Sequence, residues 1–214
     1  FSGLAAGDYS IQIRDGNGCT SPLTIYTINE PTAVTHSVVI TDVTCNDGSD
    51  GAIEVTAAGG TAPYEFSNDG GATWTTGASN PHTFGTLTAG NYDIQVQDAN
   101  GCTSVISTET VNEPAPITFD TTLTNVTCNG GNDGEIEIIN VAGGSGAGYE
   151  YSSDDGTNWQ PGNVFSGLTA GNYNLVVRDG NGCTSETVPA TITEPSPIVV
   201  TLVDSLLSCG SLPV

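Results

Sequence analysis

The residues with the clearest chemistry are six cysteines, which recur at two periodic positions. One class stands in the motif N-G-C-T-S and the other in V-T-C or L-S-C: Cys19, Cys102 and Cys183, and Cys45, Cys128 and Cys209. No C-x-x-C motif is present, and no histidine lies beside a cysteine. Zinc and redox sites are therefore disfavoured, and the pattern predicts disulfides formed in an oxidising compartment.

Oxygen-rich loops are the second group of residues that could do chemistry. Two equivalent loops carry them: Asn46, Asp47, Ser49 and Asp50, and then Asn129, Asn132 and Asp133. Calcium takes about six to eight oxygen ligands, so Asp47, Asp50 and Asp133 are candidate calcium ligands. EF-hand spacing is absent, and turn residues of these types normally hydrogen-bond the backbone. Ordinary turn chemistry accounts for the same loops, and we expect no other cofactor.

A catalytic site is not expected, although one motif resembles an enzyme motif. Residues 67–74 fit S-x-D-x-G-x-T-W, the Asp-box of sialidases, and residues 152–159 nearly do. The Asp-box is a hairpin device that also occurs outside enzymes. Sialidases hold the substrate carboxylate with several arginines, whereas each complete repeat here has at most one. His36 and His82 do not recur in the second complete repeat, and we expect them at the solvated surface.

Charge excludes two classes of partner. The 24 acidic residues face only Arg14 and Arg178, which gives a formal net charge of −22. A polyanion would be repelled, so nucleic acid is excluded as a partner and an anionic membrane surface is disfavoured. No apolar run approaches the ~18 residues of a membrane span, so no membrane insertion is expected.

The elements that position these residues are repeated. Residues 1–31, 84–114 and 165–195 align without a gap, offset by 83 and then 81 residues, and share F-x-x-L-x-A-G-x-Y, D-x-N-G-C-T-S and T-x-x-E-P. A period near 82 residues suits a unit that folds alone. We therefore expect a window on a longer array: the end of one repeat at 1–31, complete repeats at 32–114 and 115–195, and the start of a further repeat at 196–214. The alternatives for this last segment are a variant repeat and a different domain.

The strand pattern predicts an all-β chain of tandem immunoglobulin-like Greek-key β-sandwiches. Short runs rich in Val, Ile, Thr and Tyr alternate with Gly, Asn and Asp clusters. Seven strands are expected in the second complete repeat: 117–127, 134–141, 149–153, 158–160, 165–168, 172–179 and 184–193. The glycine and tyrosine of A-G-x-Y suit a tight turn and a tyrosine corner, and D-x-N-G suits the final hairpin. Proline in E-P stiffens each joint, so the domains should form a semi-rigid string.

Disulfide pairing has three alternatives. An 11-residue first strand would place the two cysteines of one repeat more than ~30 Å apart, which disfavours Cys45–Cys102. The leading alternative is a staple between consecutive repeats, Cys45–Cys183. The second alternative is the same-repeat bond Cys45–Cys102, which becomes possible if the predicted strand positions are wrong. The third is a hairpin across each E-P joint, which would pair Cys19–Cys45, Cys102–Cys128 and Cys183–Cys209.

The chain resembles the SprB-type repeats of bacterial gliding-motility adhesins and the related PKD-like repeats of cell-surface proteins. The resemblance rests on V-T-C at 43–45, D-G-A-I at 50–53, G-G-T-A-P-Y-E-F-S at 59–67, D-G-G at 69–71 and residues 87–102. It departs at Gly146 to Gly148, which lack a proline before the tyrosine, and at Leu207 to Cys209. Such bacteria O-glycosylate D-[S/T]-x sites, which makes Thr121 and Ser205 candidate glycosylation sites.

The resemblance implies an extracellular fibre on a bacterial cell surface, used for adhesion or gliding, with outer-membrane secretion and anchoring machinery as partners. Neighbouring repeats of the same chain are the other expected partners, and the external ligand is unspecified. The domains would serve as a non-catalytic mechanical stalk. The alternatives are a module that binds glycan or a surface through exposed Trp74 and Trp159, or a subunit of an extracellular filament or matrix. A tryptophan packed under its own hairpin favours the stalk.

Overall fold

The computed structural model describes residues 1–202 and contains only strands, turns and irregular segments there. The chain divides into two compact units, Phe1–Glu113 and Pro114–Val214. No helix among the described residues has the length and hydropathy of a membrane span. The predicted all-β class is confirmed, because each unit contains a complete immunoglobulin-like sandwich.

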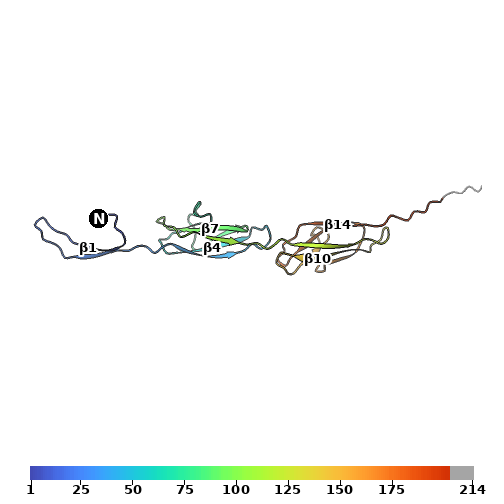
Figure 1. The fold of residues 1–214 in the computed structure, drawn as a ribbon, viewed down its shortest axis with the longest axis horizontal. Coiled ribbons are helices and arrows are strands. Elements are labelled where there is room, and N and C mark those ends of the chain that lie inside the picture. Colours follow the sequence, from blue (N-terminus) through green and yellow to red (C-terminus); the bar gives the residue numbers. More distant parts are fainter. Residues whose placement is uncertain (203–214) are drawn as a thin grey trace, which may run out of the picture. The chain divides into compact units, whose positions relative to one another are not determined.

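In the first sandwich, two three-stranded antiparallel sheets pack face to face, with β4 in one layer and β7 in the other (Figure 1). One sheet has the order β3-β4-β6, with bounds Thr35–Thr41, Gly51–Ala58 and His82–Leu87. The other has the order β5-β7-β8, with bounds Glu65–Ser67, Gly90–Gln97 and Ser107–Val111. The chain changes sheet after β4, β5 and β6, which is the Greek-key connectivity of immunoglobulin-like domains.

The second sandwich repeats this topology (Figure 1). Its sheets have the orders β9-β10-β12 and β11-β13-β14. The bounds are Thr118–Thr124, Gly134–Ala142 and Val164–Leu168 for the first sheet, and Glu150–Ser152, Gly171–Arg178 and Val188–Ile192 for the second. Residues 1–31 contain one antiparallel pair, β1 (Gly7–Ile11) with β2 (Thr24–Ile28). The predicted division at residue 31 stays a prediction.

Alternation along the strands builds the core. Ile53 and Val55 of β4 face Ile94 and Val96 of β7, and all four side chains are fully buried. Phe66 of β5 completes the centre of this core. Ile94 and Val96 thus form the inward face of β7.

The fourth predicted strand, 158–160, is wrong. Residues 158–160 form a single bridge, between Gln160 and Tyr151, instead of a strand. The first strand ends at Thr124, before the predicted Thr127, because the N–H of Val126 turns to the carbonyl of Thr193. The last strand begins at Val188 because the Ser185 hydroxyl accepts the N–H of Val177, which replaces a ladder bond.

The tyrosine corner is confirmed in all three copies. The hydroxyl of Tyr92 donates to the carbonyl of Thr88 over 2.9 Å, and Tyr173 makes the same contact with Thr169. Tyr9 donates to the carbonyl of Ala5 over 2.8 Å. This repeated tyrosine therefore ties the turn before each penultimate strand.

Candidate functional site

The hairpin of D-x-N-G-C-T-S is organised by its aspartate. Asp98 is only 4% exposed, and its Oδ1 accepts the N–H groups of Asn100 and Cys102, each over 2.9 Å. Its Oδ2 accepts the N–H of Thr61, which lies in the loop between β4 and β5. These bonds, first that from Cys102, lower the pKa of Asp98 below its ordinary value. The carboxylate therefore fastens two loops that are 37 residues apart.

The second sandwich repeats this arrangement. Asp179 accepts the N–H groups of Asn181, Cys183 and Ser145 over 2.9, 2.9 and 2.7 Å. The G-G motif provides the space, because a Cβ on Gly144 would lie 2.6 Å from the Asp179 carboxylate. These repeated residues thus form a structural cross-link.

The candidate calcium ligands lie at the turn that follows the first strand of each sandwich. Asp50 Oδ1 accepts the N–H of Thr44 over 2.9 Å, and the N–H of Asp47 donates to Glu113 over 2.7 Å. Hydrogen bonds from Thr44, first that of its side chain, lower the pKa of Asp50. Within residues 1–202, no group of three or more His, Cys, Asp or Glu side chains is placed to hold a metal ion.

In the second sandwich, Asp133 makes the equivalent contacts. It accepts the N–H and the hydroxyl of Thr127 over 3.0 and 2.5 Å, and the hydroxyl contributes most to lowering its pKa. The joint glutamate Glu194 accepts the N–H of Gly130 over 2.6 Å. These oxygens stabilise turns, and calcium binding stays a prediction.

The cysteines differ in bonding. Cys45 and Cys183 are disulfide-bonded, whereas Cys19, Cys102 and Cys128 are exposed free thiols. The same-repeat pairs Cys45–Cys102 and Cys128–Cys183 are therefore wrong, and so are the hairpin pairs Cys19–Cys45 and Cys102–Cys128. Disulfides at Cys19, Cys102 and Cys128 stay a prediction, since only the pairs named above are contradicted. Cys209 lies outside the described residues.

The staple Cys45–Cys183 stays a prediction. It uses the two cysteines that are bonded, and it offers Cys19, Cys102 and Cys128 no partner within this sequence. We expect a non-reducing peptide map to contain a Cys45–Cys183 linked peptide that disappears on reduction. A map joining Cys45 to any other cysteine would contradict the staple.

The Asp-box forms a closed hydrogen-bond network. The hydroxyl of Ser67 donates to Asp69 over 2.6 Å and accepts the N–H of Gly71 over 2.8 Å. Asp69 also accepts the N–H and the hydroxyl of Thr73 over 2.9 and 2.6 Å. Together these donors, with Ser67 the largest, lower the pKa of Asp69 to about 2. Such a group remains a carboxylate at neutral pH and suits a turn better than proton transfer.

This network predicts loss of stability in acid. Because the pKa of Asp69 is lower in the folded than in the unfolded chain, its contribution is complete above about pH 4 and is lost as the pH falls towards about 2. We expect the difference in melting temperature between the wild type and Asp69→Asn to shrink over this range. Glu54→Gln, on the exposed face of β4, is the matched control and should show no such convergence. A pH-independent difference would contradict the assignment.

The two tryptophans are half-buried beside their hairpins. The guanidinium carbon of Arg178 lies 4.4 Å from the ring centroid of Trp159, and Arg178 Nε donates to Glu150 over 2.7 Å. A Cβ on Gly71 would lie 3.2 Å from the Trp74 ring. Arg178 therefore occupies surface of the Trp159 ring that a stacked sugar would need.

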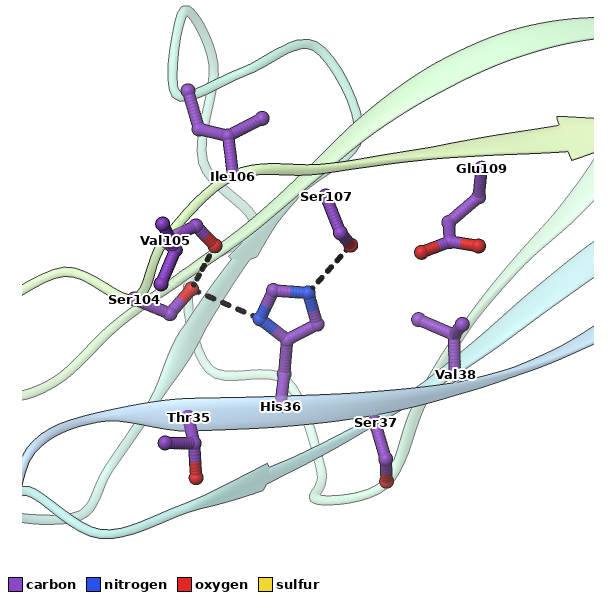
Figure 2. Close-up of a pocket in the computed structure, with 9 residues that line it drawn as sticks. All are labelled: Thr35, His36, Ser37, Val38, Ser104, Val105, Ile106, Ser107 and Glu109. Atoms are coloured by element: carbon purple, nitrogen blue, oxygen red, sulfur yellow. Dashed lines mark hydrogen bonds between the residues drawn. The ribbon is translucent and has the colours of Figure 1, made fainter.

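His36 lines a pocket that sequence reasoning missed (Figure 2). Its ring rises from β3 between Ser104 and Ser107, with Nδ1 2.9 Å from the Ser104 hydroxyl and Nε2 2.8 Å from that of Ser107. The pocket has a volume of about 320 Å³, and Glu109 also lines it. His36 is half-buried, so its predicted place at the solvated surface is wrong. His82 is likewise half-buried and stacks on Phe66 with ring centroids 5.2 Å apart.

His36 predicts a pH dependence specific to the first sandwich. Burial lowers the pKa of His36 and Glu109 opposes this shift, so the folded state favours the neutral ring. Stability should therefore be complete above about pH 6.5 and fall at lower pH. The second sandwich has Phe119 at this position. We expect His36→Phe to flatten the melting temperature of the first sandwich between pH 7 and 5, and an unchanged slope would contradict the assignment.

The candidate glycosylation site Thr121 lies in β9 opposite Ile138, which is buried in the core. Opposed residues of an antiparallel pair share a face of the sheet, so half-buried Thr121 points towards the interior side. The other candidate, Ser205, lies outside the described residues. Glycosylation stays a prediction.

Comparison with known proteins gives one family match. Residues 37–73 and 121–158 match the model of the SprB repeat, and each match runs from the first strand of a sandwich into its Asp-box hairpin. No curated protein matches the sequence.

Solved structures with similar chains are distant in sequence. The N-terminal eight Ig domains of Down Syndrome Cell Adhesion Molecule isoform 1.30.30 match at 12% identity and a TM-score of 0.41, over 89% of this chain and 28% of that one. This chain thus spans less than a third of that structure. Fibronectin(III)-like modules of Clostridium thermocellum CbhA match at 17% identity and a TM-score of 0.29, over 75% and 93%. A C-terminal fragment of intimin, solved with the intimin-binding domain of its translocated receptor, matches at 14% identity and a TM-score of 0.35. The match covers 76% of this chain and 64% of the intimin chain.

Proposed function

Since the chain carries two SprB repeats, each within an immunoglobulin-like sandwich, we propose that it is a structural and adhesive segment of a large bacterial cell-surface fibre of the gliding-motility type. Its domains act as spacers that hold a binding region away from the cell. Neighbouring repeats, an outer-membrane secretion system and an anchor are its partners. The disulfide-bonded Cys45 and Cys183 support an extracellular location.

One observation carries this proposal: the recurring aspartate, tyrosine and serine make contacts inside their own domain. Asp98 fastens two loops, Tyr92 closes a corner and Ser104 bonds the backbone of β7. Each of these three recurring side chains is thus engaged in a contact within its own domain. Repetition therefore serves length and stiffness, which is what a spacer requires.

Electron microscopy of the protein released from the surface of its native cells tests the proposal. We expect thin beaded fibres with one bead per repeat of about 82 residues. Compact particles would contradict the spacer role.

Glycan binding by the domains themselves is less well supported, because Arg178 lies over the ring of Trp159. A glycan array distinguishes this alternative. Binding that is lost in Trp159→Ala and kept in Trp159→Phe would favour a glycan-binding module over a spacer.

A further inference from the structure

His36 and Ser107 meet in the hollow of about 320 Å³ at one side of the first sandwich (Figure 2). The two residues belong to β3 and β8, which are edge strands of different sheets, so the hollow lies between the margins of the two sheets. Nε2 of His36 lies 2.8 Å from the Ser107 hydroxyl. This separation is within the range of about 2.6–3.2 Å over which a general base takes the proton of a nucleophile.

The hydrogen bonds of Ser104 fix the tautomer of His36. The Ser104 hydroxyl donates its one hydrogen to the carbonyl of Val105 over 3.1 Å. Its two lone pairs accept the N–H of Val96 over 3.0 Å and the hydrogen of His36 Nδ1, 2.9 Å away. In the neutral ring Nε2 therefore carries no hydrogen and accepts the O–H of Ser107. This is the tautomer in which a histidine serves as base to a serine.

The charges around the ring suit the same role. Burial lowers the pKa of His36, which leaves the ring neutral and able to accept a proton at neutral pH, while the negative charge of Glu109 acts in the opposite direction. Glu109 lines the same hollow. Its carboxylate would stabilise the imidazolium that forms when the ring takes a proton. The pair thus combines an unprotonated base with a counter-charge for its protonated form.

The second sandwich shows that this group of side chains is not needed for the fold. Its residues at the positions of His36, Ser107 and Glu109 are apolar: Phe119, Val188 and Ala190. Ser104, by contrast, is matched by Ser185, which bonds the backbone in the same way. The serine at 104 therefore serves the sandwich itself, whereas the histidine, serine and glutamate are an addition to the first one.

The rest of the hollow indicates a class of substrate. Its lining includes the apolar side chains of Val38, Val105 and Ile106, and the last two are exposed. Apolar walls with a few directed polar groups suit a small uncharged ligand. Glu109 and the net charge of −22 repel anions. We propose that Ser107 is a nucleophile activated by His36 and attacks uncharged esters of short apolar acids.

The reaction uses only the ester and water. Ser107 Oγ bonds to the carbonyl carbon of the ester while its proton passes to His36 Nε2. The bond from this carbon to the alcohol oxygen then breaks, and the leaving oxygen takes the proton from Nε2. Water attacks the acyl-serine by the same two steps, which releases the carboxylic acid and restores both side chains. This activity does not depend on the proposed adhesive role.

A fluorophosphonate probe tests the nucleophile in the full chain, because an activated serine displaces its fluoride and keeps the phosphonyl group. Peptide mass spectrometry should find the adduct on Ser107, formed at least about 100-fold faster than on Ser37. Ser37 is the internal control, since it lines the same hollow and both nitrogens of His36 are already engaged. Labelling of Ser107 no faster than that of Ser37 would overturn the proposal.

Two substitutions copied from the second sandwich remove one partner each. His36→Phe should slow the labelling of Ser107 by about 100-fold or more. Ser107→Val should abolish the rapid release of p-nitrophenol from p-nitrophenyl acetate that accompanies acetylation of Ser107. The melting temperature of the first sandwich shows whether each variant is folded. Undiminished labelling in folded His36→Phe would contradict the role of the histidine.

The pH profile of the wild type gives a readout that needs no variant. The labelling rate should rise as His36 loses its proton, with Glu109 as the neighbouring charge, and level off above about pH 6.5. A serine that reacts without a base would react faster throughout the alkaline range. A rate that continues to rise there would overturn the proposal.

Discussion

Replacing Gly59 by alanine should destabilise the first sandwich by about 3 kcal/mol or more. Gly59 lies at φ +71°, and an added Cβ would lie 2.0 Å from the carbonyl oxygen of Ala33. The left-handed backbone costs alanine about 1–2 kcal/mol, and a clash with backbone that cannot move aside adds about 1–3 kcal/mol. Urea unfolding followed by the fluorescence of Trp74, in a Trp159→Phe background, measures this loss for the first sandwich alone.

Substitutions at two other glycines separate the cost of the left-handed backbone from the cost of the steric clash. Gly77 has φ +69° with nothing within 4 Å of an added Cβ, whereas Gly85 has open space without a positive φ. Gly77→Ala should therefore cost about 1–2 kcal/mol through the backbone alone. Gly85→Ala should be close to neutral. If Gly59→Ala lowered the free energy of unfolding no more than Gly77→Ala, the backbone at Ala33 would have moved aside to accommodate the added Cβ. That result would refute the proposed clash.

Phe66→Ala should have a comparable or larger effect, about 3–5 kcal/mol. The Phe66 ring is fully buried between the sheets and stacks on His82. Removing the ring leaves a cavity. Neighbouring Ile53 and Ile94 could fill it only if β4 and β7 shifted. Because a domain of this size is stable by only about 5–15 kcal/mol, the midpoint of urea unfolding should fall sharply.

The matched control for Phe66 is Val39→Ala in β3. Val39 is 64% exposed, so its truncation leaves no cavity. Its cost should stay within about 0.5 kcal/mol. A loss below about 1 kcal/mol for Phe66→Ala would mean that the core collapses around the site, contrary to its close packing.

Local pattern was enough to predict much of the fold. The inward face of β7, the tyrosine corner at Tyr92 and the hairpin before Cys102 follow from alternation and turn preferences over a few residues. The strand predicted at residues 158–160 failed because its residues close the Asp-box hairpin, in which the side-chain bonds of Asp154 replace strand pairing.

The candidate sites were harder to predict, since they depend on contacts between distant segments. The sequence predicts Asp98 in a hairpin turn, whereas its bond to Thr61 requires two distant loops to meet at one end of the sandwich. The sequence predicts His36 at the solvated surface, yet the fold brings it between Ser104 and Ser107. No periodicity within one strand encodes which segment of the other sheet will face it.

Sequence alone determined the repeat, the all-β class, the turns and the two classes of cysteine, because these depend on neighbouring residues and on periodicity. Only the tertiary structure decided which cysteines are bonded and which are free, that His36 lies between two serines, and that Arg178 lies over Trp159. The reason is physical: turn and strand preferences act over a few bonds, whereas these contacts exist only after two sheets have packed and brought distant side chains within a few ångströms.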